Sequence, residues 1–150
     1  MKIPFLKRKE DRQEKVPSTF LQLGNEDQVF TEQFRALRAK FEYRADVLNC
    51  KVVAVTSAIA GEGKTVSAVN LATNLVSSGR KKVLLVDADL RKSDLAKGMR
   101  VSPLPGLSEY LSGSVTFKEI LRNSFAPGLY VIPGGMRIAS GSEDGTVRVW

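Results

Sequence analysis

Ala58-Ile59-Ala60-Gly61-Glu62-Gly63-Lys64-Thr65 is the stretch of this chain that decides its fold. An apolar, β-branched run precedes it over residues 51–57, and an Ala/Val/Leu stretch follows it to about Ser77. The first run predicts a buried strand and the second predicts a helix. A glycine-containing turn between a strand and a helix, ending in Lys-Thr, predicts a phosphate-binding loop and therefore an α/β fold.

The residue types in this loop fit the binding of a nucleoside triphosphate. Gly61 and Gly63 allow backbone N–H groups to converge on one anion, and the following helix adds its positive dipole end. Lys64 can reach the β- and γ-phosphates, and the Thr65 hydroxyl can coordinate Mg²⁺. Ala58 replaces the first glycine of G-x-x-x-x-G-K-[ST], so the loop is a variant; the alternative is an ordinary turn with an incidental lysine. The predicted ATP-binding residues are Gly61, Glu62, Gly63, Lys64, Thr65 and Val66.

A second apolar run, over residues 82–86, leads directly into Asp87-Ala88-Asp89-Leu90-Arg91. The run predicts a strand, and open α/β sheets place their ligand chemistry beyond the carboxyl ends of their strands. Two carboxylates at that position can hold Mg²⁺ or accept a proton from an attacking hydroxyl. The alternative is that one of them caps the next helix, which Ser93-Asp94-Leu95 can also begin.

Four motifs in order give the chain a more specific resemblance over about residues 30–135. They are GEGKT at 61–65, VLLVDADLRKS at 83–93, GLSEYLSG at 106–113 and LYVIPGG at 129–135. Together they resemble the bacterial protein-tyrosine kinases of capsule and exopolysaccharide synthesis. Upstream, Glu32, Arg35 and Arg38 match the E-x-x-R-x-x-R motif of those kinases. The family shares its deviant P-loop fold with chromosome-partitioning and septum-placing ATPases.

The resemblance implies roles for the matching residues. Lys64 serves the phosphates of ATP, Thr65 and Asp87 serve Mg²⁺, and Asp87, Asp89 and Lys64 carry the catalysis. The E-x-x-R-x-x-R residues on a predicted helix imply a homo-oligomer; from the residues alone they form an exposed charge ladder. We expect a cytoplasmic protein, since the sequence shows neither an apolar run of membrane-spanning length nor the apolar core of a signal peptide. The resemblance further implies a membrane-anchored activator that recruits the protein to the inner face of the membrane. Ala60, where partitioning ATPases carry a signature lysine, argues against the partitioning class.

Two family features are missing from the sequence: a third acidic motif after the 129–135 strand, and a tyrosine-rich tail that accepts phosphate. Tyr43, Tyr110 and Tyr130 are the only tyrosines, and each lies in a patterned segment rather than in an acceptor cluster. We therefore expect nucleotide binding without autokinase activity from this chain alone. A non-catalytic nucleotide-binding or assembly module and a chimeric fusion remain as alternatives.

Three regions are expected along the chain: a charged N-terminal arm over 1–29, the kinase-like part over 30–135, and a tail over 136–150. Residues 138–150 resemble the inner hairpin of a WD-repeat blade, with Asp144-Gly145 as the turn. The alternatives are an ordinary hairpin and a junction near Met136 between unrelated sequences. The expected fold class is a P-loop NTPase-like α/β domain with an incomplete, doubly wound, mostly parallel sheet and a C-terminal β-hairpin.

Composition and charge indicate whether the chain can form a core and which further kinds of protein it can be. With 43% hydrophobic residues among 150, the chain can build one core. The net charge of +7 comes partly from the mixed-charge run 7–15, which we interpret as solvated, since no aromatic residues interleave with it as a nucleic-acid surface needs. No specific nucleic acid is therefore expected. A lone cysteine excludes disulfides, and no apolar run is long enough to span a membrane.

Overall fold

The computed structural model describes residues 28–91, 93–136, 139–141 and 147–149. Five helices lie in this part of the chain: α1 Gln28–Val47, α2 Lys64–Val76, α3 Leu95–Met99, α4 Leu107–Leu111 and α5 Phe117–Ile120. It also contains five strands: β1 Val83–Val86, β2 Arg122–Asn123, β3 Leu129–Ile132, β4 Ala139–Gly141 and β5 Val147–Val149. The expected arm 1–29 lies outside the described residues except for its last two.

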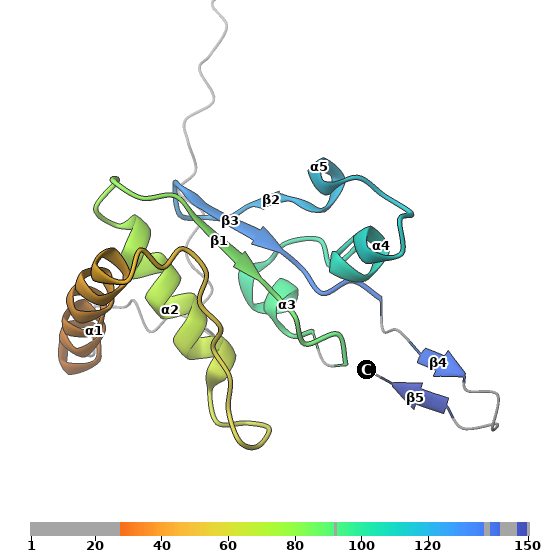
Figure 1. Ribbon diagram of the computed structural model, residues 1–150, viewed down its shortest axis with the longest axis horizontal. Helices are drawn as coiled ribbons and strands as arrows, with labels where there is room; N and C mark the ends of the chain where they lie inside the picture. Colours follow the sequence, from red (N-terminus) through yellow and green to blue (C-terminus); the bar gives the residue numbers. More distant parts are fainter. Residues whose placement is uncertain (1–27, 92, 137–138, 142–146, 150) are drawn as a thin grey trace, which may run out of the picture.

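A three-stranded mixed sheet with the order β1-β3-β2 forms the centre of the fold (Figure 1). β1 and β3 run parallel, with Val83 opposite Leu129 and Val86 opposite Ile132. The short β2, which the sequence did not predict, pairs antiparallel with β3. Because β1 and β3 are parallel, both carboxyl ends lie at one edge of the sheet, where an α/β fold places its ligands. The α/β class is confirmed.

The core forms where α2 and α3 pack with β3 in one cluster. Its buried members are spaced three or four residues apart on α2 and two residues apart on β3, so they lie on one face of the helix and one face of the strand. They are Val69, Ala72, Val76, Leu95, Met99, Leu129 and Val131. Val83 and Leu85 of β1 pack against this cluster, whereas Leu84 and Val86 are 44% and 43% exposed. The core therefore covers one face of β1 and leaves the other open.

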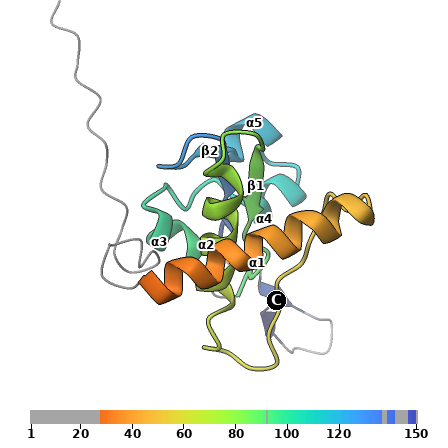
Figure 2. The ribbon, with the colours of Figure 1, turned by 90° about the vertical axis from the view of Figure 1, so that its left-hand side faces the viewer.

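Helix α1 lies across α2, as the view in Figure 2 shows. The Arg38 guanidinium on α1 donates to the Asn74 carbonyl oxygen (3.3 Å) and to the Ser77 hydroxyl (3.1 Å) near the end of α2. A cation at a helix C-terminus complements the helix dipole and satisfies carbonyls that the helix itself leaves unpaired. On α1 the rings of Phe30 and Phe34 contact each other in a tilted arrangement, with centroids 4.8 Å apart and planes at 47°.

The strand predicted over residues 51–57 is wrong: this segment has no regular secondary structure. Val52, Val53 and Val55 are 86%, 50% and 44% exposed. Strand propensity is expressed only when the backbone N–H and C=O groups pair with a neighbouring strand. Within the described part of the chain, β1 pairs only with β3, and no described strand pairs with 51–57.

The predicted C-terminal hairpin is present as a sheet of its own. β4 and β5 are antiparallel, with Ala139 opposite Val149 and Gly141 opposite Val147. The turn proposed at Asp144-Gly145 lies outside the described residues. Across the part of the chain that the structure describes, no helix is both long and apolar enough to cross a membrane.

Candidate nucleotide site

Two glycines of the 58–65 loop adopt the backbone conformation that their residue type permits. Gly61 and Gly63 have φ angles of +88° and +83°, a left-handed region that favours glycine. A Cβ at either position would meet no atom within 4 Å, so the constraint is backbone geometry and not crowding. Gly63 is the N-cap of α2, and Lys64 and Thr65 open that helix. The loop therefore ends at a helix N-terminus, as the sequence predicts.

The Glu62 carboxylate folds back over the start of the loop. Its Oε2 accepts hydrogen bonds from the N–H groups of Ala58 (3.0 Å) and Ile59 (3.3 Å). The Ser57 hydroxyl donates to the Ile59 carbonyl oxygen at 2.9 Å. An acidic side chain therefore holds two loop amides by charge-assisted hydrogen bonds.

The two predicted aspartates lie at the carboxyl end of β1 and contact different partners. Asp87 Oδ1 accepts from the backbone N–H of Asp89 (3.0 Å), and its Oδ2 accepts from the Ser93 hydroxyl (2.7 Å). The Asp89 carboxylate instead lies 3.3 Å from Lys64 Nζ. This ion pair brings the loop lysine and the second aspartate together, although they are 25 positions apart in the sequence.

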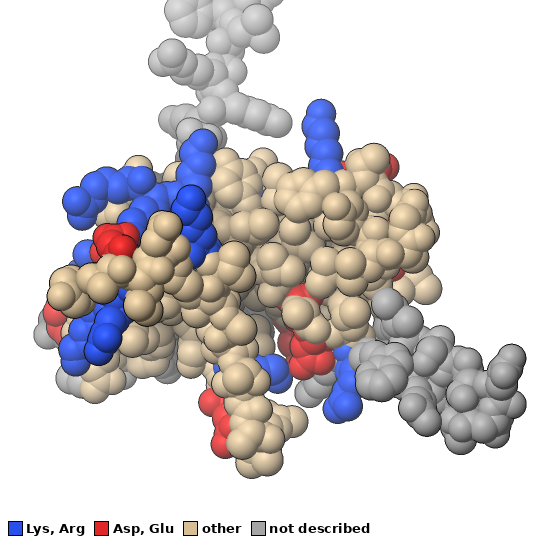
Figure 3. Space-filling view, viewed as in Figure 1, with Lys and Arg blue, Asp and Glu red and all other residues tan. Residues whose placement is uncertain are grey.

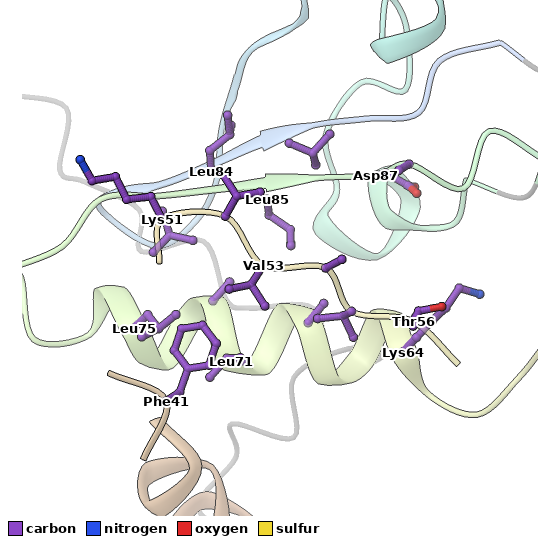
Figure 4. A pocket seen from close by; sticks show the side chains of 18 of the residues that line it. Phe41, Lys51, Val53, Thr56, Lys64, Leu71, Leu75, Leu84, Leu85 and Asp87 are labelled. Atoms are coloured by element: carbon purple, nitrogen blue, oxygen red, sulfur yellow. The ribbon is translucent and has the colours of Figure 1, made fainter. Parts of the chain in front are cut away.

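These groups lie along a groove of about 1360 Å³ between the 51–56 segment, α2 and β1. In the close view of Figure 4, Lys64, Thr56 and Asp87 are at one end, and Phe41, Leu71 and Leu75 are toward the other. Thr65, Asp89 and Arg91 also line it. The groove is thus polar and charged at the carboxyl edge of the sheet and apolar along its length.

The donors at the polar end suit Mg²⁺. Thr65, Asp87 and Asp89 offer hydroxyl and carboxylate oxygens, which are hard ligands. Among the described residues, no group of three or more His, Cys, Asp or Glu side chains gathers to enclose a metal. Mg²⁺ keeps several waters and is commonly held by one or two carboxylates together with substrate phosphates. The donor set therefore fits a nucleotide-bound Mg²⁺ better than a metal caged by protein alone.

Glu109 of α4 forms a set of hydrogen bonds, here called the clamp, next to the Pro133-Gly134-Gly135 segment. The sequence did not predict it. The Glu109 carboxylate accepts from the N–H groups of Gly106 (2.6 Å) and Met136 (3.0 Å) and from the Ser108 hydroxyl (2.9 Å). Burial raises the pKa of Glu109, but these hydrogen bonds together bring it below its usual value of 4.5. The available signal was a glutamate three residues after the N-cap Gly106, where the acidic half of a capping box accepts from the N-cap N–H.

Of the three predicted oligomerisation residues, two are exposed and one is engaged within the chain. Glu32 and Arg35 pair with each other at 2.6 Å, and their side chains are 66% and 61% exposed. Arg38 instead joins α1 to α2, with its side chain 26% exposed. Figure 3 shows lysine and arginine side chains gathered over the end of the molecule that α1 forms. Tyr43, also on α1, is 69% exposed despite its place in a patterned segment.

Comparison with known proteins places the chain in a family. Residues 50–144 match the model of the family described as "AAA domain". The match runs into the 138–150 segment, and these comparisons give the WD-repeat resemblance no support.

The chain is similar in sequence to named bacterial proteins and in structure to a solved kinase domain. Tyrosine-protein kinase CpsD of Streptococcus agalactiae is 34% identical over 105 residues, which are 69% of this chain and 44% of that protein. The succinoglycan biosynthesis transport protein ExoP of Rhizobium meliloti is 33% identical over 107 residues, 71% of this chain and 14% of that protein. The solved kinase domain of the Escherichia coli tyrosine kinase ETK matches with a TM-score of 0.66 and 31% identity, covering 71% of this chain and 41% of that one. The chain spans less than half the length of each.

The loop, the aspartates beyond β1 and the sheet order thus occur in a chain whose sequence and structure both match kinase domains. The chain belongs to the AAA domain family and, within it, is a homologue of the bacterial tyrosine-protein kinases.

Proposed function

We propose that this chain binds ATP with Mg²⁺ in the loop formed by residues 58–65. The observation that carries the proposal is the 3.3 Å contact between Lys64 Nζ and Asp89 Oδ2. It brings the cation suited to phosphate within reach of the carboxylates suited to metal, at the N-terminus of a helix of 13 residues. In this proposal, Gly61 through Val66 surround the phosphates, and Lys64 exchanges Asp89 for a phosphate oxygen.

The proposed division of roles follows from the chemistry of each side chain. Thr65 and Asp87 hold Mg²⁺, which neutralises charge on the phosphates when bound. Asp87 and Asp89 orient the metal and an incoming tyrosine hydroxyl, while Lys64 stabilises charge on the transferred phosphoryl group. Because the chain spans less than half of its relatives, tyrosine autophosphorylation is proposed for the whole protein and not for these 150 residues.

We propose that the protein is located in the bacterial cytoplasm and regulates the synthesis and export of a polysaccharide. The name of the relative ExoP, a succinoglycan biosynthesis transport protein, supports it. In this setting the protein assembles with copies of itself through the α1 motif, in which Glu32 and Arg35 contact the other copy and Arg38 holds α1 against α2. A membrane-anchored activator brings it to the inner face of the membrane. The exposed Glu32 and Arg35 side chains are available for such an assembly.

Nucleotide titration by calorimetry tests the binding proposal. Replacing Lys64 with alanine removes a charge-assisted contact of roughly 1.5–3 kcal/mol, so the affinity for Mg·ATP should fall about tenfold to a hundredfold. Lys118→Ala is the matched control, because Lys118 is an exposed lysine of α5 that does not line the groove. Equal affinity of the wild type and Lys64→Ala would rule out this site.

A further inference from the structure

A hydrogen-bond network behind the proposed metal site includes a residue to which neither the motifs nor the resemblance gave a role in metal or nucleotide binding. Ser93 follows Asp87 by six positions, and the sequence suggested for it only a place at the start of a helix. The structure gives it another environment. α3 begins after its N-cap residue Asp94, and Ser93 lies just outside this helix. The Ser93 hydroxyl instead donates to Asp87 Oδ2 at 2.7 Å.

The same hydroxyl oxygen is held from its other side. The backbone N–H of Gly134, 41 positions away, donates to Ser93 Oγ at 3.2 Å. Ser93 therefore uses its one donor on the carboxylate and accepts from a backbone group just beyond β3. Because a hydroxyl can rotate freely, the Gly134 N–H also biases its hydrogen toward Asp87.

Gly134 is itself fixed in place. Its carbonyl oxygen accepts from Ser108 N–H at 3.0 Å, and Pro133 accepts from Leu107 N–H at 2.7 Å. A Cβ on Gly134 would approach both Cβ and Oγ of Ser93 to 2.9 Å, so only glycine fits here without moving the serine. The α4 clamp thus supports Gly134, which supports Ser93, which supports Asp87.

We propose that Ser93 is a positioning residue that, together with Gly134, holds the Asp87 carboxylate in the orientation that supports Mg²⁺ in the nucleotide complex. The inference rests on the proposed function, since it assigns Ser93 to the same site. Asp87 Oδ1 is fixed by its own loop through Asp89 N–H, and Ser93 fixes the second oxygen. With both oxygens restrained, the carboxylate presents its remaining lone pairs in one direction.

A comparison of ATP affinity with Mg²⁺ and with EDTA separates positioning from a general structural role. Ser93→Ala should weaken the binding of Mg·ATP about three- to tenfold, the range for the net contribution of one ordinary hydrogen bond, because Ser93 acts on the ligand only through Asp87. Its affinity for ATP in EDTA should remain within about twofold of the wild type, because no phosphate-binding group is altered. Gly134→Ala reaches the same contact from the other side and should show the same metal-specific loss. Ser102→Ala is the control, since that exposed hydroxyl bonds only to its own loop at Leu104.

The outcomes distinguish this inference from the proposal on which it rests. A wild-type chain that binds no ATP would refute the nucleotide site itself. A wild type that binds Mg·ATP while Ser93→Ala changes neither affinity, or lowers both equally, would overturn the role of Ser93 alone. If both variants fail to fold while Ser102→Ala folds, the network is structural and the inference is equally overturned.

Discussion

Replacing Glu109 with glutamine tests whether the clamp on the Gly134 turn is an energetic element of the fold. The carboxylate accepts three hydrogen bonds, two on Oε1 and one on Oε2. Glutamine keeps one acceptor oxygen, so either one or two of the three donors would face an amide NH₂. Hydrogen bonds to charged groups contribute roughly 1.5–3 kcal/mol each, and the side chain is only half-buried. We therefore expect the free energy of unfolding at pH 7 to fall by about 2–3 kcal/mol, or the melting temperature by about 4–12 °C.

The pH dependence of this loss follows from the lowered pKa of Glu109. A carboxyl whose pKa is lower in the folded state than in the unfolded one stabilises the fold fully above its usual value, here 4.5. That contribution is lost as the pH falls through the folded-state pKa. Urea unfolding of the wild type and Glu109→Gln at several pH values should therefore show a stability difference that is largest near pH 7 and shrinks below about pH 4.5.

Glu32→Gln is the matched control for this series. Glu32 carries the same charge but forms an exposed ion pair, so its loss should change the unfolding free energy by only about 0.2–1 kcal/mol. A difference between wild type and Glu109→Gln that stays constant from pH 7 to pH 3 would refute the reasoning, as would a Glu109→Gln chain as stable as the wild type.

Further predictions concern the open groove, α1 and the turn after β3. Val52→Ala should change the unfolding free energy by no more than about 0.5 kcal/mol, because the side chain is 86% exposed, whereas Ile120→Ala, at a residue that is 0% exposed, should lower it by about 2–5 kcal/mol. A loss at Val52 as large as that at Ile120, measured by urea unfolding, would contradict the exposure of Val52 in the groove. Arg38→Ala should lower the melting temperature, since it removes the contact between α1 and α2, while Arg35→Ala should lower only the mass seen by light scattering. If Arg35→Ala leaves that mass unchanged, the proposed assembly surface lies elsewhere. Gly135→Ala should be strongly destabilising in the same unfolding assay, because φ is +88° and a Cβ would clash with Ser108 and Glu109; a wild-type melting temperature would contradict it.

The sequence predicted those features of the fold that depend on a few adjacent residues. The glycines with positive φ, the helix that starts at Lys64 and the strand before Asp87 each follow from a few adjacent residues. The 51–57 run shows the limit: its β-branched residues match a buried strand, but strand formation depends on a neighbour that the run itself does not encode.

Contacts between distant residues were the features that the sequence did not predict. The Asp87 carboxylate accepts a hydrogen bond from Ser93, and Ser93 accepts one from Gly134. Gly134 in turn accepts one from the Ser108 N–H of α4, and no local pattern predicts that these residues meet. Arg38 fits a charge ladder in sequence, yet the packing of α1 across α2 places its guanidinium on the Asn74 carbonyl. In each case the sequence shows that a group can form a hydrogen bond, but only the folded backbone determines which distant group becomes its partner.

The most direct test of the central claim, that the 58–65 loop and the aspartates beyond β1 form one nucleotide site, is a nuclear magnetic resonance titration with Mg·ATP. We predict that the backbone amide signals from Ala58 to Thr65 shift together with that of Asp89, because phosphate replaces Asp89 at Lys64 and Glu62 at the loop amides. Amides of α5, remote from the groove, should stay within experimental error. Saturating shifts confined to other residues, or no shifts at millimolar Mg·ATP, would contradict the account.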